Sequence, residues 1–215
     1  MIRRILEWLF PRKCILCRTI LSKDETDLCR DCRTDQPEYR YGKKKVPHIS
    51  DLTAVWMYQG QVSKSLQRYK FGSARHYAAP YGQLLAMRIL RDLPRADVIT
   101  WVPVSAKRLR ERGYDQVELL AQAVSPELGI PAVKCLHKFR DNRANSSLKT
   151  PAERRANVLG VYKAVDPERF RGQRVLLLDD IVTTGATASE CARVLLTAGA
   201  EEVIFAAVAA ATSSK

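Results

Sequence analysis

One short stretch near the C-terminus constrains the fold of this chain more than any other. It spans residues 175–187 and has the sequence V-L-L-L-D-D-I-V-T-T-G-A-T. The apolar run at its start is typical of a strand buried on both faces of a sheet. Two acidic residues and a short polar loop follow, and we expect a helix from about residue 188. A second apolar run at 203–211 predicts another strand, so this part of the chain indicates a βαβ unit.

The order of these parts suits a phosphorylated sugar. Loop amides just ahead of a helix lie at the positive end of its dipole, where a phosphate binds well. Threonine hydroxyls add donors, and Gly185 lets the backbone approach a ligand closely. Two adjacent ionised carboxylates accept hydroxyl protons, which suits a vicinal diol. We therefore interpret the stretch as a ribose 5-phosphate site, against the alternative of a buried strand that ends in a solvated acidic turn.

At every position the stretch resembles the phosphoribosyl diphosphate (PRPP) signature of type I phosphoribosyltransferases. In that family the two acids hold the ribose hydroxyls and the loop holds the 5-phosphate. The resemblance implies a catalytic role for Asp179 and Asp180. It implies PRPP binding by these two acids and by the loop residues Thr183, Thr184, Gly185, Ala186 and Thr187. The rival phosphate motifs G-x-x-x-x-G-K-[ST] and G-x-G-x-x-G do not occur in the sequence.

Four cysteines near the N-terminus form two C-x-x-C pairs with eleven residues between the pairs. Four thiolates from two tight turns can close a tetrahedral zinc site, and such a site has no open position for catalysis. The alternative is two disulfides, but nothing in the sequence indicates an oxidising compartment. We therefore predict a structural zinc ion bound by Cys14, Cys17, Cys29 and Cys32.

The length of 215 residues is sufficient for one α/β domain and a small additional module. We expect a zinc-ribbon-like module at 1–36, a linker at 37–50, and a phosphoribosyltransferase-like domain at 51–215 with a largely parallel sheet and flanking helices. No apolar run is long enough to span a membrane. The first ten residues are interpreted as a short amphipathic helix rather than a signal peptide, so a cytoplasmic location is expected.

A net charge of +13 predicts attraction to polyanions such as nucleic acid, unless it only solvates the surface. Basic residues gather at 43–45, 107–112 and 138–155. The aromatic residues near these clusters can stack nucleic-acid bases if they are exposed; they are Tyr39, Tyr41, Tyr69, Phe71 and Tyr114. We expect Phe71 to lie in the core instead. We also expect that charge reversal at 43–45 leaves PRPP binding unchanged, because this patch lies outside the signature.

Further motifs, taken together, resemble one family. They are F-P-R-K-C at 10–14, Y-K-F-G at 69–72, V-P-V-S at 102–105, R-L-R-E-R-G-Y-D-Q at 108–116 and R-R-A-N-V at 154–158. With the cysteine pairs and the PRPP signature, they resemble the ComF family of competence proteins over essentially the whole chain. That family joins an N-terminal zinc module to a type I phosphoribosyltransferase domain and is linked to the handling of incoming single-stranded DNA in natural transformation.

The resemblance implies magnesium-dependent phosphoribosyl transfer to an unidentified acceptor, with single-stranded DNA and with competence and recombination proteins as partners. The alternative is an accessory factor that binds PRPP and single-stranded DNA without turnover. Within a loop at 103–108 that faces the diphosphate, the resemblance implies PRPP contacts from Val104, Ser105 and Arg108.

The resemblance also implies a flexible hood at 140–157, with Arg140, Arg143, Asn145 and Arg154 as its binding residues. Two positions depart from the family pattern. Asn145 stands where many members carry Gln, and Asp115 stands where many carry Asn. Both replacements are polar, so the architecture is unaffected, and the contacts of these two residues are left open.

Overall fold

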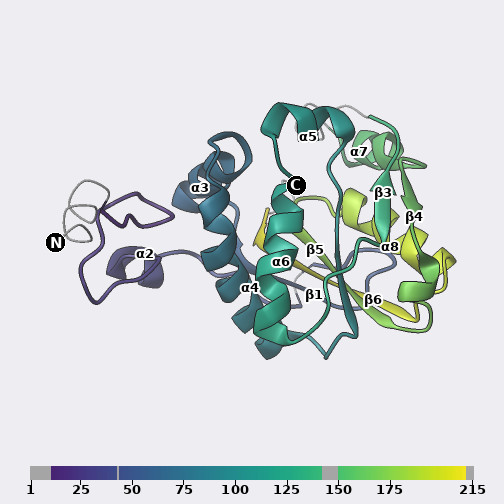
Figure 1. Ribbon diagram of the computed structural model, residues 1–215, viewed down its shortest axis with the longest axis horizontal. Coiled ribbons are helices and arrows are strands. Elements are labelled where there is room, and N and C mark those ends of the chain that lie inside the picture. Colours follow the sequence, from purple (N-terminus) through teal and green to yellow (C-terminus); the bar gives the residue numbers. More distant parts are fainter. Residues whose placement is uncertain (1–10, 43, 142–149, 212–215) are drawn as a thin grey trace.

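A parallel sheet forms the centre of the molecule (Figure 1). The computed structural model describes residues 11–42, 44–141 and 150–211, and the helix expected at the N-terminus lies outside them. Within the described residues, the main sheet has the strand order β1 (Leu52–Met57), β6 (Glu202–Ala210), β5 (Arg174–Val182) and β2 (Val98–Trp101). Every neighbouring pair is parallel. The predicted architecture is therefore confirmed.

Helices cover both faces of this sheet because its central strands are apolar on both sides. Leu176 and Leu178 of β5 belong to one buried cluster, whereas Val175 and Leu177 belong to the other. This alternation is the two-residue period of a strand. The first cluster is covered by α3 (Gly60–Phe71), α4 (Ala78–Asp92) and α6 (Gln116–Leu128), and the second by α8 (Ala186–Thr197).

The smaller elements surround this framework. They are α2 (Arg30–Thr34), η1 (Arg75–Tyr77), α5 (Ala106–Arg112), α7 (Pro151–Val158), η3 (Pro167–Arg169) and an antiparallel pair, β3 (Leu136–Lys138) with β4 (Tyr162–Ala164). Thr150 caps α7, because its hydroxyl accepts the Glu153 amide and the Glu153 carboxylate accepts the Thr150 amide. Among the described residues, no helix is both long and apolar enough to cross a membrane.

The cysteine-rich N-terminal segment lies at one end of the molecule, next to α3 (Figure 1). Two side chains of α3 hold it there. The Ser65 hydroxyl donates to the carbonyl of Ile15. The Arg68 guanidinium donates to the carbonyls of Ile15 at 3.0 Å and Leu16 at 2.5 Å. The segment is therefore docked on the helical layer by hydrogen bonds to its backbone.

The segment at 37–50 is packed against the main domain along much of its length. The Tyr39 amide donates to the Val55 carbonyl of β1 at 3.2 Å, and Glu38 forms an antiparallel bridge with Trp56. Val46 is buried, and its side chain lies against Gly185. This part of the chain thus covers the edge of the sheet and reaches the loop after β5.

Candidate functional site

A cleft of about 680 Å³ lies at the carboxyl ends of β2 and β5, where ligands bind in parallel α/β sheets. Nine of the ten residues expected to bind PRPP line it: Val104, Arg108, Asp179, Asp180, Thr183, Thr184, Gly185, Ala186 and Thr187. Ser105 is the one expected residue that does not line the cleft. Its side chain is buried and caps α5, where it accepts the Arg108 amide at 3.4 Å. Ser105 therefore shapes the loop rather than the wall of the cleft.

The two adjacent acids have different environments. Asp180 is only 3% exposed, and its carboxylate is held by the Lys70 ammonium at 2.8 Å and the Gln116 amide at 3.0 Å. Asp179 accepts the backbone amide of Asp180 at 2.8 Å and is only partly buried by surface area. Desolvation and the charge of Asp180 raise the pKa of Asp179, and Lys70 opposes them. Asp180 is thus anchored, whereas Asp179 has an oxygen left for a ligand.

The loop after β5 requires a glycine for two reasons. Gly185 has a φ of +80°, in the left-handed region that glycine adopts at no steric cost. A Cβ at this position would also lie 2.5 Å from Cγ2 of Val46. Helix α8 begins at the next residue, two positions earlier than expected, so the amides of its first turn have no acceptor within the helix. Such amides at a helix N-terminus can bind an anion, so this loop is a candidate anion site at the cleft.

Lys44 ties the segment at 37–50 to this same loop. Its ammonium donates to the Thr183 carbonyl and to the Ala211 carbonyl, the latter at 3.1 Å. The side chain is partly buried, which lowers its pKa. The expectation that the lysine patch has no connection to the signature is therefore wrong for Lys44. Lys45 is exposed, and Lys43 lies outside the described residues.

Asp115 positions the opposite wall of the cleft. One carboxylate oxygen accepts the amides of Val117 at 2.9 Å and Glu118 at 3.2 Å, which caps α6. The other accepts the Val104 amide at 3.2 Å. Because both oxygens accept, an asparagine could reproduce only one side of this arrangement. The departure at position 115 thus fixes the loop expected to face the diphosphate.

Phe71 lies at the cleft rather than in the core, which corrects the expectation from the sequence. It is 73% exposed, lines the cleft, and stacks under the Arg112 guanidinium, 4.8 Å from the ring centroid. The reason is its place at the last residue of α3, where the preceding Tyr69 occupies the core instead. Among the other aromatic candidates, Tyr41 is exposed, whereas Tyr39 and Tyr114 are buried.

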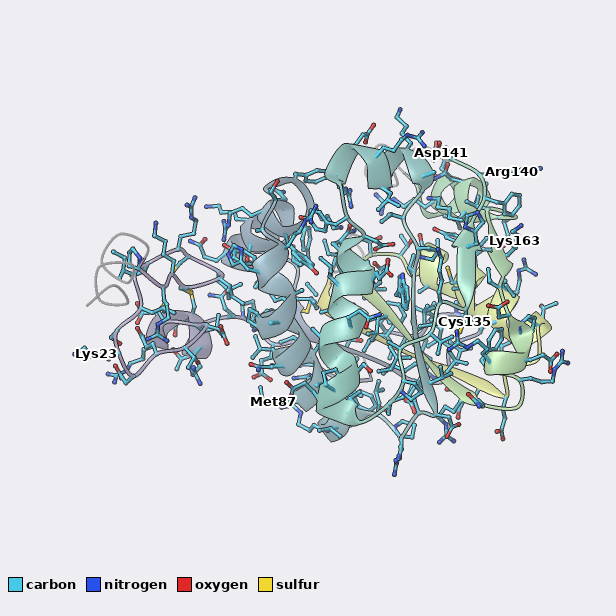
Figure 2. All side chains as sticks on the ribbon, viewed as in Figure 1. Lys23, Met87, Cys135, Arg140, Asp141 and Lys163 are labelled. Carbon is cyan, nitrogen blue, oxygen red and sulfur yellow. The ribbon has the colours of Figure 1, made fainter. Side chains whose placement is uncertain are left out.

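Of the four residues expected in the hood, the structure describes Arg140 and Arg154. Arg154 lines the cleft. Arg140 lies at the periphery of the molecule beyond β3 (Figure 2), with its guanidinium 5.5 Å from the ring of Phe139. Arg143 and Asn145 lie outside the described residues. The described part of the hood thus contributes one of its predicted residues to the cleft.

Several cleft residues were not predicted as site residues. Lys70 and Gln116 fall inside sequence blocks that resemble the family, so their blocks contained a usable signal. Lys138 and Tyr162 come from β3 and β4. The sequence indicates less about Lys138. In a strand of only three residues, the single clue is that Lys138 alternates with His137 and so shares the inward face with Leu136. The ion pair between Asp180 and Lys70 could not be predicted from the sequence, because the two residues are 110 positions apart.

The four predicted cysteine ligands lie together. Their sulfur atoms are all within 4.8 Å of one another, and those of Cys17 and Cys29 are 3.6 Å apart. A tetrahedral zinc site with Zn–S bonds of about 2.3 Å has sulfur atoms about 3.8 Å apart, so the arrangement fits zinc. A turn with Arg18 at a φ of +70° places the first pair, and the start of α2 places the second.

Two protein-family models match parts of this chain. Residues 5–41 match the double zinc ribbon domain, and residues 118–215 match the phosphoribosyl transferase domain. Together with the four clustered cysteines, the first match supports a structural zinc ion. The second match agrees with the parallel sheet and flanking helices described above.

Two curated relatives are similar over most of their length. Competence protein F of Haemophilus influenzae is 28% identical over 90% of this chain and 95% of its own. DNA utilization protein YhgH of Escherichia coli K12 is 27% identical over 90% of this chain and 94% of its own. Among solved structures, the glutamine PRPP amidotransferase of B. subtilis is 25% identical with a TM-score of 0.44. That match covers 65% of this chain and only 30% of the amidotransferase.

Proposed function

Because this chain belongs to the ComF family of competence proteins, we propose that its cleft binds PRPP with magnesium and transfers the phosphoribosyl group to an acceptor. The observation that carries the proposal is the convergence in one cleft of an anion-binding loop at 183–187 with the acids Asp179 and Asp180. The relatives are named for competence and DNA utilization, which also motivates a role in the handling of incoming DNA.

Each part of PRPP has a counterpart in the cleft. The 5-phosphate would lie on the amides and hydroxyls of the loop at 183–187, at the positive end of α8. The ribose hydroxyls would donate to Asp179, whose partner Asp180 is fixed by Lys70. The diphosphate would face Arg108 and the Val104 backbone on the wall that Asp115 positions.

Departure of diphosphate leaves positive charge at C1 of the ribose and builds negative charge on the leaving group. The acids at the end of β5 would stabilise the first, and basic side chains around the diphosphate would stabilise the second. Magnesium, when bound with PRPP, neutralises diphosphate charge, and the carboxylates of Asp179 and Asp180 supply oxygens of the kind it prefers. Closure over the cleft would exclude the water that otherwise hydrolyses PRPP.

Calorimetry with PRPP tests this proposal directly. We expect wild-type protein to bind PRPP about tenfold more tightly, or better, with magnesium than without. Magnesium neutralises charge on the diphosphate, and each gain of about 1.4 kcal/mol in binding free energy raises the affinity tenfold. Pyrophosphate release, measured with and without nucleobases or single-stranded DNA, separates transfer from binding alone. Binding without release under all these conditions would favour the accessory-factor alternative, and no binding with magnesium would reject both.

A second function, the binding of single-stranded DNA, is favoured by the exposed ring of Phe71 beside Arg112 at the cleft. An aromatic face beside a basic surface stacks bases irrespective of sequence. Helix α5 adds exposed basic residues next to the cleft, including Lys107 and Arg110. The net charge of +13 favours the same class of partner.

Salt dependence tests the DNA interaction. We expect log affinity for single-stranded DNA to fall with log salt at about 0.7 per phosphate neutralised. Arg110→Glu should flatten this slope by about one phosphate contact, whereas Phe71→Ala should lower affinity by about 1–3 kcal/mol per stacked base with little change in slope. Fluorescence anisotropy titrations at several salt concentrations measure both quantities.

The matched control is Arg95→Glu, an exposed arginine just ahead of β2 and therefore at the opposite end of the strands from the cleft. If Arg95→Glu and Arg110→Glu flatten the slope equally, the interaction is a diffuse surface effect and the α5 assignment fails. Neither arginine lines the cleft, so PRPP affinity should stay unchanged in both variants.

A further inference from the structure

Lys138 is a charged side chain of the cleft to which the family signature assigns no role. It is the last residue of β3, where strand alternation turns it inward with Leu136 while His137 points outward. It lines the cleft, yet it is only 7% exposed. A lysine buried to this extent is uncommon unless its charge is paired.

No acceptor for the Lys138 ammonium occurs among the residues that the structure describes, either as a hydrogen bond or as an ion pair. Its one close partner in that part of the chain is the ring of Tyr162 on β4, with the ammonium 5.5 Å from the centroid. A cation over an aromatic face gains modest attraction, far less than the cost of taking an ammonium out of water. Within the described residues, the ammonium therefore has no directly paired anion.

The charges around Lys138 come from three parts of the chain. Arg108 of α5 repels its protonated form, whereas Asp141 after β3 and Asp179 of β5 favour it. Burial is the largest influence, and the result is a pKa of about 8. Both cations line the cleft, and Arg108 belongs to the loop expected to face the diphosphate. An anion placed between them would be attracted to both side chains.

We propose that Lys138 is a ligand-binding residue of this cleft and that the anion it recognises is a diphosphate group. The inference rests on the proposed function, because in PRPP this group is the leaving diphosphate. The ammonium would donate to diphosphate oxygens, and any Lys138 that is neutral beforehand would take a proton from the buffer. Part of the lysine population is therefore neutral near pH 8, so binding of the diphosphate should be accompanied by proton uptake.

Calorimetry with inorganic pyrophosphate and magnesium tests this inference, in two buffers of different ionisation enthalpy at pH 8. Lys138→Met should bind pyrophosphate at least tenfold more weakly than wild type. Lys138→Arg should retain binding but take up fewer protons than wild type, because arginine stays protonated. Proton changes on pyrophosphate itself are common to both proteins and cancel in that difference.

The matched control is Lys163→Met on β4, next along the chain to Tyr162 but exposed to solvent. Figure 2 shows Lys163 at the periphery of the molecule. This variant should behave as wild type in affinity and proton uptake. Ribose 5-phosphate provides a second probe, because Lys138→Met should leave its affinity unchanged. An equal loss for ribose 5-phosphate and pyrophosphate would overturn the placement on the diphosphate.

The outcomes separate this inference from the proposed function. If PRPP binds wild type and Lys138→Met equally, and proton uptake matches in wild type and Lys138→Arg, the inference fails and the proposed function stands. If pyrophosphate binding depends on Lys138 but PRPP does not bind, the inference stands and the proposed function fails. If wild type binds neither compound, both are rejected.

Discussion

Removal of zinc is expected to unfold the N-terminal module while the parallel sheet keeps its fold. Structural zinc contributes about 10 kcal/mol or more to the folding of such modules, and the buried apolar side chains of this segment, such as Leu16 and Leu28, belong to the core cluster of the main domain. Hydrogen exchange should therefore become fast throughout residues 11–36 after chelation. Amides of β5 and β6 should stay protected, because their partners lie inside the sheet.

The docking of this module on α3 sharpens the expected result. Ser65 and Arg68 donate to the carbonyls of Ile15 and Leu16, so unfolding of the module leaves these polar side chains without those acceptors. We expect exchange in α3 to accelerate as well, though less than in the module. The melting temperature of the main domain should fall by only a few degrees, since a loss of about 1 kcal/mol shifts a domain of this size by about 2–4 °C.

Cys14→Ser and Cys135→Ala form a matched pair for this experiment. Both cysteines are fully buried, but only Cys14 belongs to the sulfur cluster. Native mass spectrometry should find one zinc ion in wild type and in Cys135→Ala, and none in Cys14→Ser after brief exposure to a chelator. A zinc-free wild-type protein with both cysteine pairs oxidised would contradict the assignment.

The sequence predicts the framework of the site well where local pattern and chemistry coincide. The apolar run of β5 is buried on both faces, so it could only be a central strand, and the acids at its end mark the carboxyl edge. The paired cysteines likewise constrain their own turns. In both cases the signal lies within a few residues of the chain, and tertiary packing follows it.

Contacts between distant segments could not be predicted in this way. Lys44 reaches the carbonyl of Thr183 across 139 positions, and Val46 closes on Gly185. A run of lysines between Gly and Pro is typical of a solvated loop, and nothing local indicates that one of them is partly buried. The prediction that Phe71 lies in the core was wrong because the neighbouring Tyr69 occupies the core and leaves Phe71 exposed at the end of the helix.

The largest loss of PRPP affinity is expected from the acids at the end of β5, and the two acids should differ in their effect on stability. A hydrogen bond to a charged group is worth about 1.5–3 kcal/mol. Asp179→Asn and Asp180→Asn should therefore each weaken PRPP binding at least about tenfold in calorimetry. Asp180 also pairs with Lys70 and Gln116 in a nearly buried position, so its replacement should lower the melting temperature.

The two acids are therefore not expected to affect the stability of the fold in the same way. For Asp179 the expected effect on the free energy of unfolding has the opposite sign. Burial and the charge of Asp180 raise its pKa in the folded state, so the unfolded chain releases this proton at lower pH. The free energy of unfolding therefore falls as pH rises from the unfolded pKa through the folded one. Asp179→Asn removes that penalty and should melt at the same or a higher temperature than wild type at neutral pH.

The charge-matched control is Glu127→Gln, an exposed acid on α6 outside the cleft, which should change neither PRPP affinity nor melting temperature. Stability and binding are then separable in one set of variants. Asp179→Asn should lose affinity without losing stability, a combination that damage to the fold cannot produce. Asp180→Asn should lose both, because the same carboxylate anchors Lys70 and shapes the cleft. Wild-type affinity in Asp179→Asn would refute the assignment of this acid to the ribose hydroxyls, whatever the stability of either variant.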